Sequence, residues 1–189
     1  MKISFFSFAC NTNFPLDIMF RQFQKYMKES FEFILFNDAY VPQMEKDINT
    51  ICEFNKIPCV RVPQSIHKVQ NPSVSYAETL NWSVWDYAIK NNCEIVVLMH
   101  SDVFPVCDVT ISDILGNAIV ASTPEVRIID GKPVNYFYPA FTIINMKTLS
   151  NPKELNFLPC PHLDTGGSTK DFIKKYPNDI KYIPNHQIE

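Results

Sequence analysis

The sequence has few glycines, few arginines and no long apolar run. No hydrophobic stretch approaches the roughly 20 residues that a membrane-spanning helix needs, so we expect no transmembrane segment. The first residues turn polar too soon to form a signal peptide. A net charge of −3 leaves no basic face of the kind that phosphates require, so we expect no nucleic acid among the partners.

The cysteines also lack a pattern. Six are present, yet no two of them are spaced as C-x-x-C and they do not fall into paired clusters. This spacing argues against a zinc site and is typical of reduced, mostly buried thiols. We therefore expect an intracellular, cytoplasmic protein, which for a viral chain would mean the cytoplasm of its host.

The length and patterning predict one α/β domain over residues 1–189, with no repeat and no linker. Strands are expected at residues 3–8, 31–36 and 59–62, separated by helices that begin near Pro15 and Pro42. Strands that alternate with helices form a mostly parallel sheet. Beyond Pro105 shorter strands and a hairpin signal, Asp-Gly-Lys at residues 130–132, predict a mixed, partly antiparallel sheet.

A third helix and the strand after it are the best defined elements. Ser75 and Glu78 match a capping box, and we expect the helix to bury Leu80, Val84, Ala88 and Ile89. Residues 94–99 then form an apolar run without alternation, which predicts a central strand that is buried on both faces.

The strand ends at His100-Ser101-Asp102, the most informative segment of the chain. Ligands of open α/β sheets sit beyond the carboxyl ends of parallel strands. A carboxylate at Asp102 could hold Mg²⁺ or Mn²⁺ through oxygen while the metal bridges a diphosphate. The alternative is that Asp102 caps the next turn and that His100 packs at the strand end.

Two of the four glycines of the chain are adjacent, in the segment Asp164-Thr165-Gly166-Gly167 before a helix expected at residues 170–176. Such a pair lets the backbone approach a ligand, with free N–H groups at a helix N-terminus. Asp164 could orient an acceptor hydroxyl or act as a general base. The alternative is a tight loop in which Asp164 is a cap.

Asp38 follows the second strand, again at a carboxyl end, where a turn or capping role is the alternative. The three arginines, Arg21, Arg61 and Arg127, are each a candidate contact for an anion.

The order of elements and the acidic end of the fourth strand resemble the GT-A nucleotide-sugar glycosyltransferases, of small viral or bacterial type. This resemblance implies a three-layer α/β/α, Rossmann-like fold, with a mostly parallel central sheet and an antiparallel C-terminal part. In that family a D-x-D motif binds a divalent metal together with the ribose and pyrophosphate of the donor. Here histidine replaces the first aspartate, so the resemblance assigns the metal to Asp102 and a donor contact to Ser101. For His100 it leaves three roles open, namely a metal ligand, a group that supports a ligand, and a donor contact, and loss of the metal dependence is a further alternative.

The resemblance also divides the chain into a nucleotide-binding half, residues 1–105, and an acceptor half, residues 106–189. It implies donor contacts beyond the D-x-D segment, at Ser7, Phe8, Asp38, Asn81, Gly166 and Gly167. Asp164 becomes the candidate catalytic residue. His186 could supply an extra metal ligand, with a solvent-exposed tail histidine as the alternative.

The implied activity is the transfer of a hexose from a UDP- or GDP-sugar to a hydroxyl of a glycan or another acceptor, assisted by Mn²⁺ or Mg²⁺. A nucleotidyltransferase is the first alternative, although such enzymes usually have a glycine-rich loop with a basic residue after the first strand. Residues 10–13, Cys-Asn-Thr-Asn, contain neither. A non-catalytic module that binds sugars or nucleotides is the second alternative.

Overall fold

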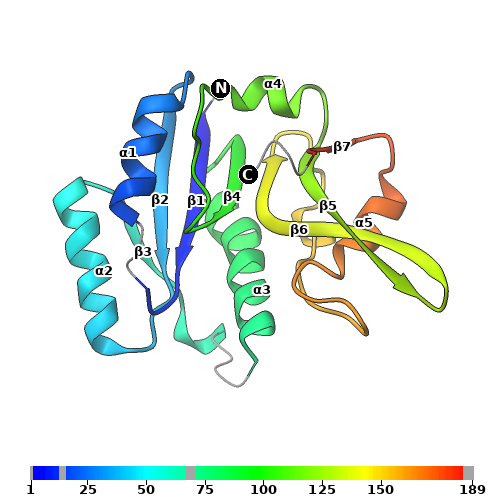
Figure 1. Ribbon diagram of the computed structural model, residues 1–189, viewed down its shortest axis with the longest axis horizontal. Coiled ribbons are helices and arrows are strands. Elements are labelled where there is room, and N and C mark those ends of the chain that lie inside the picture. The colour runs from blue at the N-terminus through cyan, green and yellow to red at the C-terminus, as the bar shows by residue number, and fades with distance from the viewer. Residues whose placement is uncertain (1, 13–15, 67–70, 185–189) are drawn as a thin grey trace.

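The computed structural model describes residues 2–12, 16–66 and 71–184 and has a seven-stranded sheet at its centre (Figure 1). The strands are β1 (Ile3–Ala9), β2 (Phe31–Asn37), β3 (Cys59–Arg61), β4 (Ile95–His100), β5 (Val120–Ile129), β6 (Lys132–Asn145) and β7 (Ile180–Tyr182). They lie in the order β3-β2-β1-β4-β6-β5-β7. The pairs from β3 to β4 are parallel, whereas β6 is antiparallel to both β4 and β5, so the predicted α/β fold class is confirmed.

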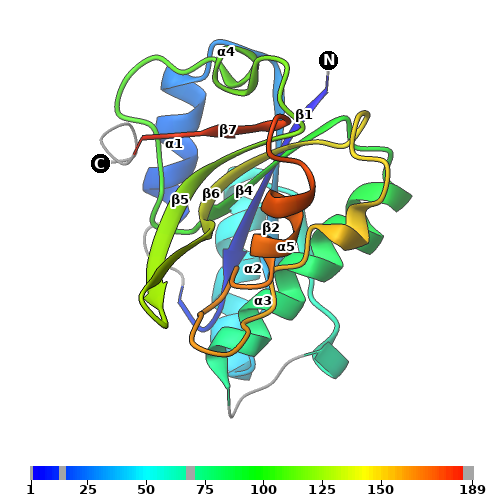
Figure 2. The same cartoon turned by 90° about the vertical axis from the view of Figure 1, so that its right-hand side faces the viewer.

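Helices cover both faces of the sheet. They are α1 (Leu16–Tyr26), α2 (Pro42–Asn55), α3 (Pro72–Trp82), the π-helical η2 (Ser83–Ala88), α4 (Ile111–Leu115) and α5 (Thr169–Lys175), with short 3-10 turns η1 (Gln64–Ile66) and η3 (Pro152–Glu154). One buried cluster packs α1, α2 and α4 against one face, and a second packs α3, η2 and α5 against the other. Figure 2 shows α3 and α5 on their common side. The result is three layers, α/β/α.

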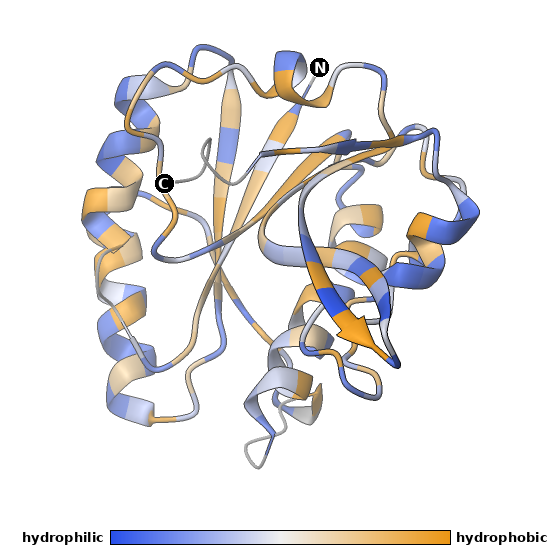
Figure 3. Ribbon diagram, turned by 45° about the vertical axis from the view of Figure 1, so that its right-hand side comes forward, coloured by the Kyte–Doolittle hydropathy of each residue, from blue (hydrophilic) through white to orange (hydrophobic). Residues whose placement is uncertain are grey.

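The central strands are apolar along most of their length, as Figure 3 shows. Residues 95–99 of β4 are all buried, which confirms the prediction from the apolar run. A strand that is covered by helices on both faces has no solvent-facing side, and an alternating pattern is therefore not needed.

Two details of the predicted helices are wrong. The N-cap of α3 is Asn71, whose side chain accepts the N–H of Val74 at 3.2 Å, and Ser75 is a buried residue inside the helix. Ile89 is 50% exposed, because η2 is π-helical and the wider turn rotates the following residues out of the stripe expected for an α-helix.

The second half of the sheet is simpler than expected. In place of the shorter strands predicted beyond Pro105, the structure has two long strands, β5 with 10 residues and β6 with 14. The hairpin turn at Asp130-Gly131 is confirmed, with both residues at positive φ. Strand β7 carries no sequence signal that we recognised. No helix within the described residues is long and apolar enough to cross a membrane.

Candidate functional site

A cavity of about 320 Å³ opens at the edge of the sheet where β4 ends. Segments that are far apart in the sequence contribute its walls: α3, the end of β4, the β5–β6 hairpin and the loop before α5. The lining side chains are those of Tyr76, His100, Glu125, Arg127, Tyr136, Tyr138, Pro139, Asp164 and Thr165. The topology therefore brings three of the predicted residues, His100, Arg127 and Asp164, into one cavity.

His100 is placed by the alternation of β4. Side chains alternate along a strand, so His100 lies on the face of Leu98, toward α3. Its ring packs edge-on against Tyr76, at 5.1 Å between centroids, and against Tyr138, at 6.0 Å. Burial lowers the pKa of His100 below 6.5, and the nearby Asp102 only partly opposes this shift. The imidazole is consequently neutral at pH 7.

Three residues that line the cavity each have a buried polar atom without a hydrogen-bond partner within the described part of the chain. One atom is Oη of Tyr136, and the other two, Nε2 of His100 and Oη of Tyr76, belong to rings that pack against each other. Burial raises the pKa of Tyr76 well above 10, so its hydroxyl keeps its proton and can donate. A buried polar atom without a partner costs free energy, and a ligand with hydroxyl groups would satisfy the atoms of His100 and Tyr76.

Asp102 lies in the turn after β4, and its side chain is 76% exposed. Its Oδ1 is 3.9 Å from Nδ1 of His100, too long for a hydrogen bond but close enough for electrostatic attraction. Ser101 is half-buried in the same turn. The carboxylate thus stands at the carboxyl edge of the sheet with its oxygens open to solvent.

Asp164 reaches the cavity from the loop before α5. The hydroxyl of Ser73, in the first turn of α3, donates to its Oδ1, and the N–H of Thr165 donates to the same oxygen at 2.7 Å. Thr165 Oγ1 also donates to the Ser73 carbonyl at 3.1 Å. These donors, first that of Ser73, hold the pKa of Asp164 below 3.8, and Arg127 contributes in the same direction. Asp164 is therefore a fixed, ionised hydrogen-bond acceptor.

This depressed pKa predicts a contribution to acid stability. The ionised form stabilises the folded state above the ordinary value of 3.8, and this stabilisation is lost as the pH falls through the lower, folded-state value. Asp164→Asn should therefore reduce the difference in unfolding free energy between about pH 6 and about pH 3, and Ser73→Ala should reduce it less. Urea unfolding at both pH values measures this difference. An unchanged difference in both variants would contradict the hydrogen bonds described for Asp164.

The glycine pair is required by close packing of the backbone. We expected its N–H groups to be free for a ligand, but both are hydrogen-bonded within the chain. Gly166 has a φ of +91°, and a Cβ there would lie 2.2 Å from the carbonyl oxygen of Phe137. A Cβ at Gly167 would lie 2.6 Å from that of Leu163. The N–H of Gly166 donates to Phe157 and that of Gly167 to Asp164, both to carbonyl oxygens. The pair shapes the loop that holds Asp164.

The remaining donor candidates lie along the same edge or inside the core. Asp38 is buried at the end of β2 and accepts a hydrogen bond from Thr79 of α3 at 3.3 Å. Ser7 and Phe8 are buried in β1, where Phe8 stacks on Phe36. Any contact of these two residues with a ligand must therefore use backbone atoms at the strand end.

Asn81 has a structural role in α3. Its side chain donates to Asn156 Oδ1 and accepts from the N–H of Phe157, each at 2.9 Å. These bonds fasten the helix to the loop after η3. Both ends of the amide are thereby occupied within the chain, and no atom of this amide lines the cavity at His100.

A divalent cation would find few protein ligands at this edge of the sheet. Among the residues that the structure describes, no group of three or more His, Cys, Asp or Glu side chains could hold a metal ion. His186 lies outside the described residues. Asp102 offers one carboxylate, which fits a cation that arrives with the phosphates of a substrate and keeps several waters, as Mg²⁺ commonly does, and Nδ1 of His100 lies 3.9 Å from that carboxylate.

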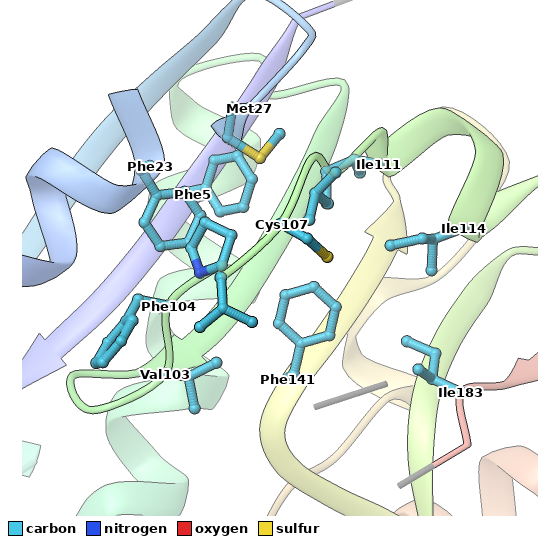
Figure 4. Close-up of a pocket in the computed structure, with 13 residues that line it drawn as sticks. Phe5, Phe23, Met27, Val103, Phe104, Cys107, Ile111, Ile114, Phe141 and Ile183 are labelled. Carbon is cyan, nitrogen blue, oxygen red and sulfur yellow. The ribbon is translucent and has the colours of Figure 1, made fainter. Parts of the chain in front are cut away.

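Two other cavities contain none of the predicted site residues. One, of about 90 Å³, lies between α1, β1 and the loop after β4 and is lined mainly by apolar side chains such as Phe5, Phe104 and Phe141 (Figure 4). The other, of about 540 Å³, borders η1 and η2 and includes Trp82 and Tyr87. Neither joins the polar groups of the β4 edge.

Sequence reasoning missed several residues that line or brace the site, namely Ser73, Tyr76, Glu125, Tyr136, Tyr138 and Thr165. A helix that precedes a parallel strand starts at the carboxyl edge of the sheet, so the first turns of α3 could have been identified. Tyr136 and Tyr138 are two residues apart and therefore share a face of β6. Arg127, predicted as an anion contact, lines the cavity and is paired with Glu125 at 2.7 Å.

No protein-family model and no curated protein matches the sequence. Solved structures do share the fold. A mannosyltransferase from Pyrobaculum calidifontis in complex with GDP-Man and Mn²⁺ has a TM-score of 0.59 over 97% of this chain, at 11% identity. TarS 1–349 of S. aureus gives 0.56 over 97% at 15% identity, and the bifunctional glycosyltransferase WbbM gives 0.60 over 96% at 11%.

This chain spans 55%, 58% and 38% of the length of those three proteins, in the same order. At such low identity the likeness establishes the fold and not the activity. The chain has a mixed α/β fold that it shares with structures of glycosyltransferases.

Proposed function

We propose that the protein transfers a sugar from a nucleoside diphosphate sugar to an acceptor hydroxyl. The observation that carries this proposal is the cavity at the end of β4, whose lining combines the ionised Asp164 with His100 and Tyr76, two residues that each have a buried polar atom without a partner in the described part of the chain. Aromatic walls with a few convergent hydrogen-bonding groups suit a sugar, which has apolar ring faces and polar edges. The glycosyltransferase fold supports the same activity.

In this proposal the donor lies along the carboxyl edge of the sheet. The nucleoside occupies the ends of β1 and β2 near Asp38, the diphosphate lies beside Asp102, and the sugar enters the cavity. Residues 1–105 thus form the nucleotide half and residues 106–189 the acceptor half. One of the similar structures holds GDP-Man and Mn²⁺, which favours a GDP-sugar as the first donor to test.

The divalent cation, when bound through Asp102 and the donor phosphates, would neutralise charge on the departing diphosphate. The remaining contacts with the donor come from side chains of the protein. His100, neutral and half-buried, can donate or accept one hydrogen bond through Nε2 without adding charge. Ser101 lies between His100 and Asp102, in the turn after β4.

Asp164 orients the acceptor in this proposal. Its Oδ1 is engaged by Ser73 and Thr165, so Oδ2 is the oxygen left to accept a hydrogen bond from the acceptor hydroxyl. A carboxylate with a depressed pKa is a weak base in the ground state, and we assign it first the alignment of the hydroxyl and second the removal of its proton as the new bond forms.

The proposal predicts metal-dependent binding of a nucleoside diphosphate sugar. Isothermal titration with GDP-mannose, UDP-glucose, UDP-N-acetylglucosamine and GTP, with Mn²⁺ and with EDTA, should find one sugar nucleotide that binds at least about tenfold more tightly with Mn²⁺. Slow release of the free sugar from that donor should accompany binding.

The other outcomes separate the alternatives. Preference for GTP or another nucleoside triphosphate would support a nucleotidyltransferase. Tight binding of a sugar nucleotide without any turnover, with a range of glycan acceptors present, would support a non-catalytic module. Binding to none of these ligands would overturn the proposed function.

A further inference from the structure

The loop that carries Asp164 is folded back on itself. Its two arms are joined by backbone bonds from Gly166 to Phe157 at 2.6 Å and from Ser168 to Leu158 at 2.9 Å. Nearer the turn, Cys160 and Leu163 exchange N–H bonds at 3.2 and 2.9 Å. A covalent modification of Cys160 would therefore affect the loop that positions Asp164.

Cys160 also has an unusual side-chain partner. Nζ of Lys170, in the first turn of α5, donates to Sγ of Cys160 at 3.0 Å. Lysines with a charged partner elsewhere in the described chain, such as Lys2, Lys147 and Lys175, contact carboxylates instead. Both groups of the Cys160–Lys170 pair are half-buried, so a small oxidant can reach them while the loop keeps them together.

We propose that Cys160 and Lys170 form an oxidative modification site, in which a single bridging oxygen joins Sγ to Nζ. The geometry that supports this is a sulfur and an amine nitrogen already in contact at 3.0 Å, so a slight approach of the flexible lysine lets one oxygen bond to both. The proposal is independent of the proposed function.

The chemistry balances with two equivalents of a peroxide. The first peroxide oxidises the thiol to a sulfenic acid and releases water. The second oxidises the neutral amine of Lys170 to a hydroxylamine and releases a second water. The hydroxylamine oxygen then attacks the sulfenic sulfur, whose hydroxyl leaves as a third water. Sulfur and nitrogen each lose two electrons, and each peroxide gains two.

The order of steps follows from the charges. Contact with Cys160 raises the pKa of Lys170, which keeps the amine protonated and protected while the thiol is unmodified. Once Cys160 is a neutral sulfenic acid, that stabilisation of the ammonium is lost and the amine is neutral more often. The bridge should therefore form faster as the pH rises.

Mass spectrometry of the peroxide-treated protein tests the site. We expect a peptide containing Cys160 to become linked to one containing Lys170, with a gain of one oxygen and a loss of two hydrogens, about 14 Da. A thiol reductant should reverse the link. Lys170→Arg, which keeps the charge, and Cys160→Ser should each abolish it, and circular dichroism confirms that both variants fold.

Two control variants are available, one on α5 itself and one in the loop after β4. Lys174→Arg, an exposed lysine of α5, and Cys107→Ser, an exposed cysteine, should leave the linked peptide at wild-type yield. The proposal is overturned if wild-type Cys160 is oxidised only to sulfenic or sulfinic acid, or to a disulfide, with no linked peptide at any pH.

Discussion

Asp102→Asn is expected to lower the rate of sugar transfer about 10²- to 10³-fold, which is the loss typical when one electrostatic contact to a developing negative charge is removed. The amide preserves the shape of the side chain but has no charge to hold a cation beside the diphosphate. The side chain is 76% exposed in a turn, so the substitution should leave the folded structure intact. Rates are measured with the donor identified by titration, at saturating Mn²⁺.

Asp108→Asn is the matched control. Asp108 is also an exposed carboxylate, 67% exposed, and it pairs with Lys28 at 2.8 Å. A surface pair of this kind contributes about 0–1 kcal/mol, so the variant should keep the wild-type rate. Equal rates in wild type and Asp102→Asn would remove Asp102 from the mechanism and leave the cavity at His100 to be explained without it.

Gly166→Ala is expected to give the largest loss of stability. The added Cβ would lie 2.2 Å from the Phe137 carbonyl oxygen, and the φ of +91° is itself unfavourable for an L side chain. Together these predict a loss of about 3–5 kcal/mol, since the clash is with backbone that cannot move without shifting β6. In a chain of this size such a loss lowers Tm by roughly 6–20 °C, which differential scanning calorimetry resolves.

Gly131→Ala separates the two causes. Gly131 has a φ of +73°, but no heavy atom lies within 4 Å of its hypothetical Cβ. Only the backbone conformation is then strained, at about 1 kcal/mol. If both variants lose the same stability, the loop before α5 can yield to the extra methyl group, and the close approach to Phe137 is not what requires glycine.

The parts of the fold that the sequence predicts are those with local causes. The apolar run of β4 needs no knowledge of its neighbours, because only a strand covered on both faces tolerates it. Pro42 stands at the start of α2 as expected, and Asp130-Gly131 forms the hairpin turn. Each of these follows from backbone preferences of the residues themselves.

The errors have different causes. The π-helical η2 turns Ile89 to solvent, which the spacing of the apolar residues does not indicate. Asn71 rather than Ser75 caps α3 because Pro72 starts the helix earlier, and this Asn-Pro pair is a local signal that the sequence does carry. Strand β7 has three residues and pairs only with β5, so tertiary pairing creates it. Its own sequence, Ile-Lys-Tyr, is too short to indicate a strand.

The site shows the same division. Asp102, His100 and Asp164 could be selected because each stands at a recognisable position, after a strand or before a helix. The residues that surround them could not be identified from the sequence. Tyr76 and Tyr138 are 62 positions apart in the numbering yet flank one imidazole, and the glycine pair serves the backbone of β6 and the loop. A glycine required by packing and one required by a ligand look identical in a sequence.

The register of the β5–β6 hairpin changes between Ser122 and Thr123, whose partners in β6 are Thr142 and Tyr138. Beyond that shift the hairpin is a ribbon of two strands, and the N–H of Phe137 holds it in place by donating to Oγ1 of Thr169 at 2.8 Å. Two strands alone are marginally stable in water. The amide hydrogens of this ribbon should therefore exchange with solvent through local opening, whereas the amide hydrogens of β1 and β4 should exchange only through global unfolding. The wall of the cavity that bears Arg127 is therefore expected to open locally before the central strands do.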